Sequence, residues 1–303
     1  MRRVFGAAFT MAATVAVGLS WATIGNAACG KVSIAEMNWA SASLMANVDK
    51  IILENGYGCE VELVAGDTMP TFTSMNEKGA PDVAPELWAN AVAVPLKKAT
   101  DEKRLIVANK GPITGLGEGW WISPYTAKKH NLKTVDDILK RPDLFPYSED
   151  KTKGAFVGCP AGWGCQLANA NLFRANEMEK KGWVLVDPGS AAGLDASLNK
   201  SLTRGENWFG YYWSPTTLIG KHSMFKVDFG VPFGGKDNWD NCIVKPEKDC
   251  ANPKKSAWTK SEVNCVVSAN FKKNASVALD YITNRVYPGE IMNSMLVFMT
   301  DQK

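Results

Sequence analysis

The stretch KVSIAEMNWASASLMANVDKIILENGYGCEVELVAG, from Lys31 to Gly66, decides the fold class. It begins and ends with short apolar runs typical of buried strands, and between them apolar side chains recur at helical spacing. Gly56 ends the helical pattern. The order of strand, helix and strand predicts two parallel strands joined by a crossover helix, which is the unit of α/β proteins.

The same alternation continues in two series along the chain. One series runs to the strand RLIVA (104–108), and another begins at EGWWISPY (118–125) and reaches the aromatic strand WFGYYW (208–213). Two series predict two lobes, each with a mostly parallel sheet covered by helices on both faces. The expected boundaries are 29–118 for the first part of lobe 1, 119–229 for lobe 2, and 230–303 for a return to lobe 1 that carries a polar disulfide loop and the C-terminal helices.

The N-terminus has the pattern of a secretory signal. Two arginines precede an apolar run that closes on small residues, which predicts a signal peptide over residues 1–28 with cleavage near Ala27 or Ala28. The position three before Cys29 is Asn26, where a lipoprotein signal normally has an aliphatic residue, so we expect a soluble protein of the periplasm. Nothing downstream approaches the roughly 18 apolar residues of a membrane span.

The charge is nearly balanced. Lys and Arg number 34 against 31 Asp and Glu, giving a formal net charge of +3, and cleavage of the signal lowers it by two. A near-neutral chain gives no electrostatic reason to expect nucleic acid or a membrane surface as partner. About 275 mature residues are enough for two lobes with their own cores, and we expect a monomer.

Seven cysteines in an exported chain predict disulfides. Spacing favours local pairs, and two cysteines that precede neighbouring predicted strands are placed to form a third. The preferred pairing is Cys159 with Cys165, Cys242 with Cys250, and Cys29 with Cys59. Cys265 then remains unpaired, and other connectivities stay open.

Three loops at strand ends each carry a tryptophan. Trp88 lies in APELWAN, Trp163 in CPAGWGC and Trp213 in GYYWSPT, and ligands of open α/β sheets bind where the carboxyl ends of strands lead into loops. Tryptophan offers the strongest cation–π face, and several together hold a quaternary ammonium group. A single tryptophan is more often a packing residue. Three at equivalent positions favour a binding cage.

The CPAGWGC segment combines several features of a binding loop. Gly162 and Gly164 allow a tight turn and a close approach of a ligand, and a disulfide would stiffen the loop. The helix that follows directs the free N–H groups of Gly164 and Cys165 to the same point, where an oxygen could be received. A small zwitterion would use both the ring and the N–H groups. The alternative is a disulfide-stapled turn with an incidental tryptophan.

Over essentially the whole mature sequence, the chain resembles the substrate-binding proteins of ABC importers for glycine betaine and related compatible solutes. GCPAGWGC, PELWAN and YYWSP are similar to the segments that supply the tryptophan cage of that family, which implies cage roles for Trp163, Trp88 and Trp213. IAEMNWAS, GDTMPTFTSMNEKG and GLGEGWW are similar to stretches of its trimethylamine N-oxide-binding members. The resemblance implies a two-lobed periplasmic binding protein fold (type II) that closes over its ligand and delivers it to an importer permease.

One position departs from the betaine-binding pattern. Where such proteins often place a histidine one turn after the first cage tryptophan, this chain has Val92, and it offers the nearby acids Glu86 and Glu118 instead. A buried carboxylate favours a cation, hydrogen-bonds an N-oxide when either partner carries a proton, and repels a carboxylated ligand. This favours trimethylamine N-oxide, with choline as a competitor and glycine betaine as the further alternative.

The resemblance makes Glu118 the candidate for contact with the ligand oxygen, and the alternative is a solvated acid in the crossover. It also suggests further cavity walls at Trp39, Trp120 and Trp121.

A metal site is a weaker expectation. KDNWDNC places Asp237 and Asp240 among two asparagines, and oxygen ligands at this density can hold calcium, although the spacing is not that of an EF-hand. Such a run is more often a turn whose side chains bond their own backbone. TGLGEGWW lacks the third glycine of a dinucleotide site and leads into an aromatic segment. We expect no cofactor other than this structural calcium.

Enzymatic chemistry finds little support. The two histidines, His130 and His222, lie in no metal-ligand or nucleophile motif, and Cys265 is more simply a buried apolar residue. We therefore expect a binding protein rather than an enzyme. A secreted enzyme acting on a choline-like substrate and a structural or adhesive exported protein remain as alternatives.

Overall fold

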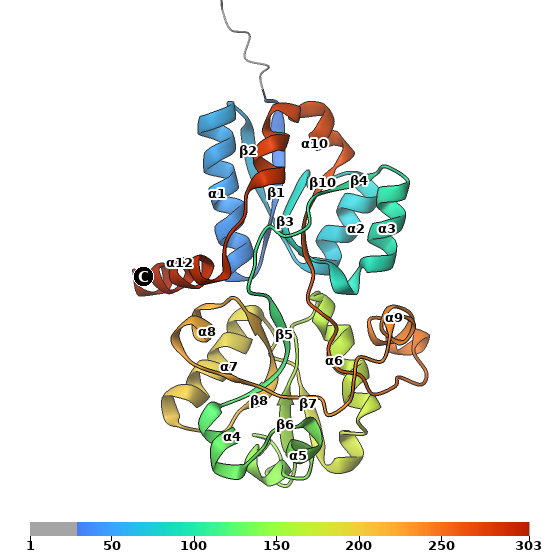
Figure 1. Ribbon diagram of the computed structural model, residues 1–303, viewed down its shortest axis with the longest axis vertical. Helices are drawn as coiled ribbons and strands as arrows, with labels where there is room; N and C mark the ends of the chain where they lie inside the picture. Colours follow the sequence, from blue (N-terminus) through green and yellow to red (C-terminus); the bar gives the residue numbers. More distant parts are fainter. Residues whose placement is uncertain (1–28, 303) are drawn as a thin grey trace, which may run out of the picture.

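The computed structural model describes residues 29–302, and the predicted signal peptide over residues 1–28 lies outside them. Two five-stranded sheets form two lobes that follow one another along the long axis of the molecule (Figure 1). In spatial order, the first sheet contains β2 (Glu60–Gly66), β1 (Lys31–Met37), β3 (Val83–Trp88), β10 (Val263–Ser268) and β4 (Leu105–Asn109). The second contains β7 (Trp183–Val186), β6 (Gly154–Val157), β8 (Phe209–Ser214), β5 (Gly117–Ile122) and β9 (Phe225–Lys226).

Each sheet is mixed. In the first, β1 is parallel to β2 and β3, while β10 is antiparallel to β3 and β4. In the second, β6 is parallel to β7 and β8, while β5 is antiparallel to β8 and β9. Both β5 and β10 begin opposite the carboxyl ends of parallel strands, because the chain enters each sheet at the edge that faces the other lobe. The predicted two-lobed α/β architecture is confirmed.

Helices cover both faces of the first sheet. α1 (Ala40–Tyr57) buries one stripe against it and ends at Gly58, whose φ of 67° allows the left-handed cap. The helices α2 and α3 pack on one face, and α1, α10 and α11 pack on the other (Figure 1). The bounds of the additional helices are Thr68–Lys78 for α2, Ala93–Asp101 for α3, Ala269–Asn274 for α10 and Leu279–Asn284 for α11.

The second sheet is covered in the same way. The helices α4, α5 and α6 contribute to one buried cluster, whereas α7 and α8 pack on the opposite face. Their bounds are Pro124–His130 for α4, Val135–Leu139 for α5, Gly164–Ala175 for α6, Ala191–Arg204 for α7 and Thr217–Lys221 for α8. Among the helices of the described chain, none is long and apolar enough to span a membrane.

The preferred disulfide pairing is confirmed. The three bonds join Cys29 to Cys59, Cys159 to Cys165, and Cys242 to Cys250. Cys265 is free and buried in the first lobe, where burial raises the pKa of its thiol to about 12. Its sulfur lies 3.5 Å from the Arg285 guanidinium, and at neutral pH the thiol is protonated, which makes it a poor nucleophile.

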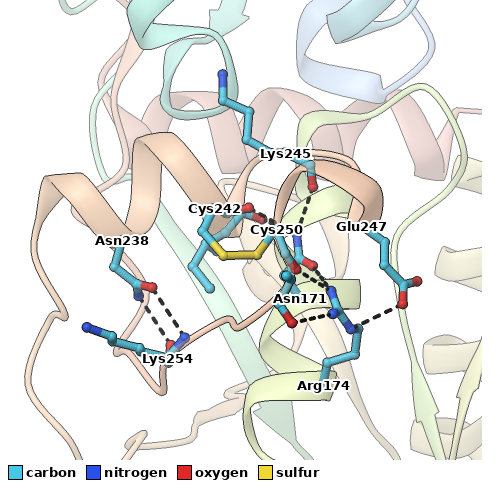
Figure 2. Close-up of a disulfide and its surroundings, with 10 residues drawn as sticks. Asn171, Arg174, Asn238, Cys242, Lys245, Glu247, Cys250 and Lys254 are labelled. Carbon is cyan, nitrogen blue, oxygen red and sulfur yellow. Dashed lines mark hydrogen bonds and ion pairs between the residues drawn. A yellow bond between two sulfur atoms is a disulfide. The ribbon is translucent and has the colours of Figure 1, made fainter.

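The polar disulfide loop belongs to the second lobe, so the predicted return to the first lobe at residue 230 is wrong. The loop contains α9 (Lys236–Asn238) and a π-helical turn, and Trp239, Ile243 and Val244 bury their side chains in the core of the second lobe. Figure 2 shows how α6 anchors the loop. Asn171 donates to the carbonyls of Cys242, Ile243 and Lys245, and Arg174 donates to that of Cys250.

The chain re-enters the first lobe only after this loop, just before β10. The C-terminal helix α12 (Gly289–Asp301) then lies at the waist of the molecule (Figure 1). Its Met292 and Leu296 pack with Met45 of α1, while Thr217 of α8 donates to the Leu296 carbonyl. α12 thus contacts both lobes.

Candidate ligand-binding site

A cavity lies between the lobes, at the edge where the parallel strands of both sheets end. Together with the open space at its mouth it encloses about 470 Å³. Aromatic rings and one carboxyl group dominate its wall. The lining residues are Trp39, Thr68, Trp88, Asn90, Ala91, Glu118, Trp163, Gly164, Cys165, Ala168, Tyr211, Trp213, Trp239, Val244 and Trp258.

The three predicted cage tryptophans all line this cavity. Trp88 is the last residue of β3 in the first lobe, Trp163 precedes α6, and Trp213 lies near the end of β8 in the second lobe. The rings of Trp163 and Trp213 meet at 86° with their centroids 5.1 Å apart, and Trp39 meets Trp163 at 74° and 5.4 Å. Because these rings stand nearly at right angles, some of them turn a face and others an edge towards the cavity. We call Trp88, Trp163 and Trp213 the tryptophan cage.

Glu86 lies behind the wall rather than in it. Its side chain is fully buried, and its Oε1 atom accepts hydrogen bonds from the indoles of Trp39 (2.8 Å) and Trp88 (2.9 Å) and from the Ser41 hydroxyl (3.0 Å). Among residues 29–302, no group forms a hydrogen bond with the Oε2 atom. Burial raises the pKa of Glu86 to about 7, against the opposing effect of these hydrogen bonds. Glu86 therefore orients two tryptophans and places an ionisable group beneath them.

Glu118 is the carboxyl group of the cavity itself. It lies at the start of β5, opposite Trp213 of β8, and is only 6% exposed. The Tyr211 hydroxyl donates to its Oε1 atom at 2.9 Å. Burial raises the pKa of Glu118 to about 7, while hydrogen bonding and the charge of Lys226 act in the opposite direction. The alternative of a solvated acid is wrong, and near neutral pH this group can accept or donate a hydrogen bond to a bound molecule.

Trp120 and Trp121 are not cavity walls, so that expectation is wrong. Trp120 is fully buried two residues further along β5, beneath α6, where its indole donates to Asn169. Trp121 points to the other face of the sheet, donates to the Tyr212 carbonyl and carries the Lys226 ammonium 5.8 Å from its ring.

The sequence reasoning missed several wall residues. Tyr211 lies two residues before Trp213 in β8, so the two side chains share one face of the strand, and the two-residue period could have identified Tyr211. Trp239 and Trp258 come from the disulfide loop and the segment after it, where no periodic pattern points to a binding site. Tyr211 and Trp258 pack with their ring centroids 5.4 Å apart, and Trp239 continues the series at 5.5 Å from Trp258. These three rings extend the aromatic wall beyond the tryptophan cage.

The loop before α6 brings its backbone to the cavity. Gly164 is the first residue of α6, and a Cβ atom there would stand 2.3 Å from the Cβ of Ala91 in the first lobe. Only glycine permits this close approach of the lobes. Gly164 and Cys165 both line the cavity, and the first N–H groups of a helix have no partner within the helix.

The calcium prediction for Asp237 and Asp240 stays a prediction. Asp237 accepts a hydrogen bond from the Asn241 amide. The Asn238 side chain donates to the Lys254 carbonyl and accepts from the Lys254 N–H group (Figure 2). Among residues 29–302, no three histidine, cysteine or acidic side chains are grouped closely enough to hold a metal ion. Comparing melting temperatures in calcium and in EDTA would test the site.

The sequence matches a protein family over nearly all of the described chain. Residues 30–303 match the family described as the substrate binding domain of ABC-type glycine betaine transport systems (OpuAC). A curated relative is the glycine betaine/proline betaine-binding periplasmic protein of Salmonella typhimurium, 26% identical over 125 residues. That match spans 40% of this chain and 37% of the relative, so the chain matches well under half of the relative's length.

Solved structures share the fold at low sequence identity. The glycine betaine/L-proline-binding protein ProX of Borrelia burgdorferi has a TM-score of 0.68 at 16% identity, over 90% of this chain and 88% of that one. A choline-binding protein of an ABC transporter, in complex with choline, has a TM-score of 0.67 at 16% identity, over 91% and 84%. Lactococcal OpuAC in its closed form with glycine betaine has a TM-score of 0.65 at 16% identity, over 90% and 91%.

Proposed function

Because this chain belongs to the family of substrate-binding domains of ABC-type glycine betaine transport systems, we propose that it captures a small methylated amine between its lobes and delivers it to an importer permease. In this proposal the protein works in the periplasm as a monomer. Lobe 1 contributes the strands within residues 29–109 and 263–268. Lobe 2 contributes the residues from Gly117 through the disulfide loop.

The tryptophan cage carries the proposal. Its rings come from three strand ends in two lobes, and they gather around one cavity with a buried carboxyl group in its wall. An ammonium group with methyl substituents donates few or no hydrogen bonds, so aromatic faces are its best partners in a desolvated site. The family membership supports a ligand of this class and gives no support to an enzymatic reaction.

Trimethylamine N-oxide is the ligand that this wall suits best. Its methylated nitrogen would lie against the tryptophan cage, and its oxygen would accept a hydrogen bond from protonated Glu118. Glu86 and Glu118 would repel the carboxylate of glycine betaine whenever either of them is ionised, which argues against that ligand. Choline is the second candidate, because its positive charge would be stabilised by ionised Glu86 and Glu118.

The two lobes would close over the ligand because the rings of the tryptophan cage belong to different lobes. In an open form, Trp88 would be presented by the first lobe, and Trp163 and Trp213 by the second. A ligand that contacts all three has a higher affinity for the closed arrangement and shifts the population towards it.

Isothermal titration calorimetry with trimethylamine N-oxide, choline and glycine betaine tests the proposal. Trimethylamine N-oxide has few heavy atoms, and a ceiling of about 1.5 kcal/mol per atom limits its binding to roughly 7.5 kcal/mol, a Kd of a few micromolar. We expect it to bind most tightly of the three, at micromolar Kd or weaker. Tightest binding of glycine betaine would contradict the role given to Glu118, and no binding of any of them would contradict the ligand class.

A further inference from the structure

The indole of Trp163 lines the cavity with its ring, and its N–H group forms a hydrogen bond with the other lobe. Its Nε1 atom donates to Oδ1 of Asn38 at 2.7 Å. Trp163 precedes α6 in the second lobe, whereas Asn38 directly follows β1 in the first. One side chain therefore forms a cavity wall and a hydrogen bond between the lobes.

Neighbouring backbone atoms fix the same loop against the first lobe. The N–H of Met69 in α2 donates to the Gly162 carbonyl at 3.0 Å. Two residues further on, Gly164 lies against Ala91 without room for a Cβ atom. The loop that presents Trp163 thus meets the first lobe on both sides of the ring. Oδ1 of Asn38 accepts from the indole N–H group, and the Asp67 side chain lies beside both residues.

We propose that Asn38 is a positioning residue that holds the closed form through Trp163 and thereby slows ligand release. The inference rests on the proposed function. Asn38 does not belong to the cavity wall, so it acts on the ligand only through the indole. A ligand packed against the Trp163 ring fixes its orientation, and in that orientation the N–H group faces Asn38. Opening the lobes breaks this hydrogen bond, which therefore stabilises the closed form alone.

A contact made only after closure affects dissociation more than association. Removing it should accelerate ligand release roughly 2- to 12-fold, the range expected for the loss of one hydrogen bond. The association rate should stay within about twofold, because capture by the open form does not use the bond.

Stopped-flow tryptophan fluorescence with trimethylamine N-oxide, and separately with choline, measures both rates in the wild-type protein and in Asn38→Leu. Asn38 is exposed, so this substitution leaves the core intact. Asn47→Leu is the matched control, because Asn47 is an exposed asparagine of α1 whose amide donates to Glu36 and Ser43 within its own lobe. Asn38→Ala serves as a second variant if leucine disturbs the loop.

Trp163→Phe separates the proposed role from a general effect on the loop. It removes the indole N–H group but keeps an aromatic ring in the wall. In this background Asn38→Leu should change Kd no further, because the bond is already lost. Small-angle X-ray scattering with saturating ligand supplies a structural readout, in which Asn38→Leu should retain a larger radius of gyration than Asn47→Leu.

The expected result is faster release from Asn38→Leu with wild-type association, wild-type rates for Asn47→Leu, and no additional effect in Trp163→Phe. Release of ligand at the wild-type rate from Asn38→Leu would overturn the proposal. So would an effect of Asn38→Leu in the Trp163→Phe protein as large as its effect in the wild-type protein. If the wild-type protein binds neither of these amines nor glycine betaine, the proposed function fails and this proposal with it. Binding by the wild type with unchanged release from Asn38→Leu overturns the role of Asn38 alone.

Discussion

The rings of Trp163 and Trp213 stand at 86° to each other with their centroids 5.1 Å apart. The first comes from the loop before α6 and the second from the end of β8, so two separate segments form one corner of the cavity. A methylated ammonium group in this corner would meet ring faces from two directions.

Trp163→Ala should raise the Kd for trimethylamine N-oxide about tenfold or more, because a desolvated cation–π contact contributes roughly 1–2 kcal/mol. Isothermal titration calorimetry measures the effect. Phe298→Ala is a suitable control, since Phe298 is an aromatic residue of α12 that is 65% exposed and lies outside the cavity. An unchanged Kd in Trp163→Ala would remove this residue from the cage.

Glu86→Gln should weaken choline binding several-fold. The substitution keeps the size of the side chain but removes the negative charge beneath Trp39 and Trp88, and with it the attraction that a cation in the cavity would feel. Calorimetry at pH 8, where the wild-type carboxyl group is mostly ionised, gives the largest difference. Glu77→Gln, an exposed change on α2, should leave binding unaltered. Equal choline affinity in both variants would show that Glu86 has only a structural role.

Substitutions of Glu118 should separate a hydrogen bond from a charge. Glu118→Gln keeps an N–H donor for an N-oxide oxygen, so trimethylamine N-oxide binding should persist while choline binding weakens. Glu118→Leu removes both properties and should weaken both ligands. If Glu118→Leu binds trimethylamine N-oxide like the wild type, Glu118 does not contact the oxygen.

The free energy of unfolding of the ligand-free protein should fall as pH rises from about 4.5 to 7. Glu86 and Glu118 have pKa values raised by burial to about 7 in the folded protein, whereas in the unfolded chain they lose their protons near 4.5. Over this interval the folded state binds more protons, so its advantage declines, by about 1.4 kcal/mol for each unit of pKa difference. The contribution is full below 4.5 and lost above 7.

Chemical denaturation at pH 5, 6, 7 and 8 measures this dependence. The double variant Glu86→Gln with Glu118→Gln should show a flatter profile, because neither amide titrates. A wild-type profile as flat as that of the double variant would mean that the pKa values of these two carboxyl groups do not differ between the folded and unfolded states.

The sequence was sufficient for the architecture and for placing three tryptophans at one cavity, because both follow from regular patterns. Strand and helix periods predict two α/β lobes. Because ligands of open α/β sheets bind at the carboxyl ends of strands, Trp88, Trp163 and Trp213 are expected to face one another there. The disulfide pairs follow from local spacing and from two neighbouring strands.

Other features depend on packing that no periodic pattern records. Trp239 buries itself in the second lobe and draws the disulfide loop with it, so the lobe boundary lies later than predicted. Trp258 reaches the cavity from an irregular segment for the same reason. The family resemblance suggested Trp120 as a cavity wall, but two residues beyond Glu118 along β5 its side chain lies beneath α6.

The most direct test of the central claim is a crystal structure of the protein with trimethylamine N-oxide. We expect density for the ligand in the cavity, with its methyl groups against Trp88, Trp163 and Trp213 and its oxygen within hydrogen-bond distance of Glu118. Density for the ligand outside this cavity, or an oxygen directed away from Glu118, would contradict it.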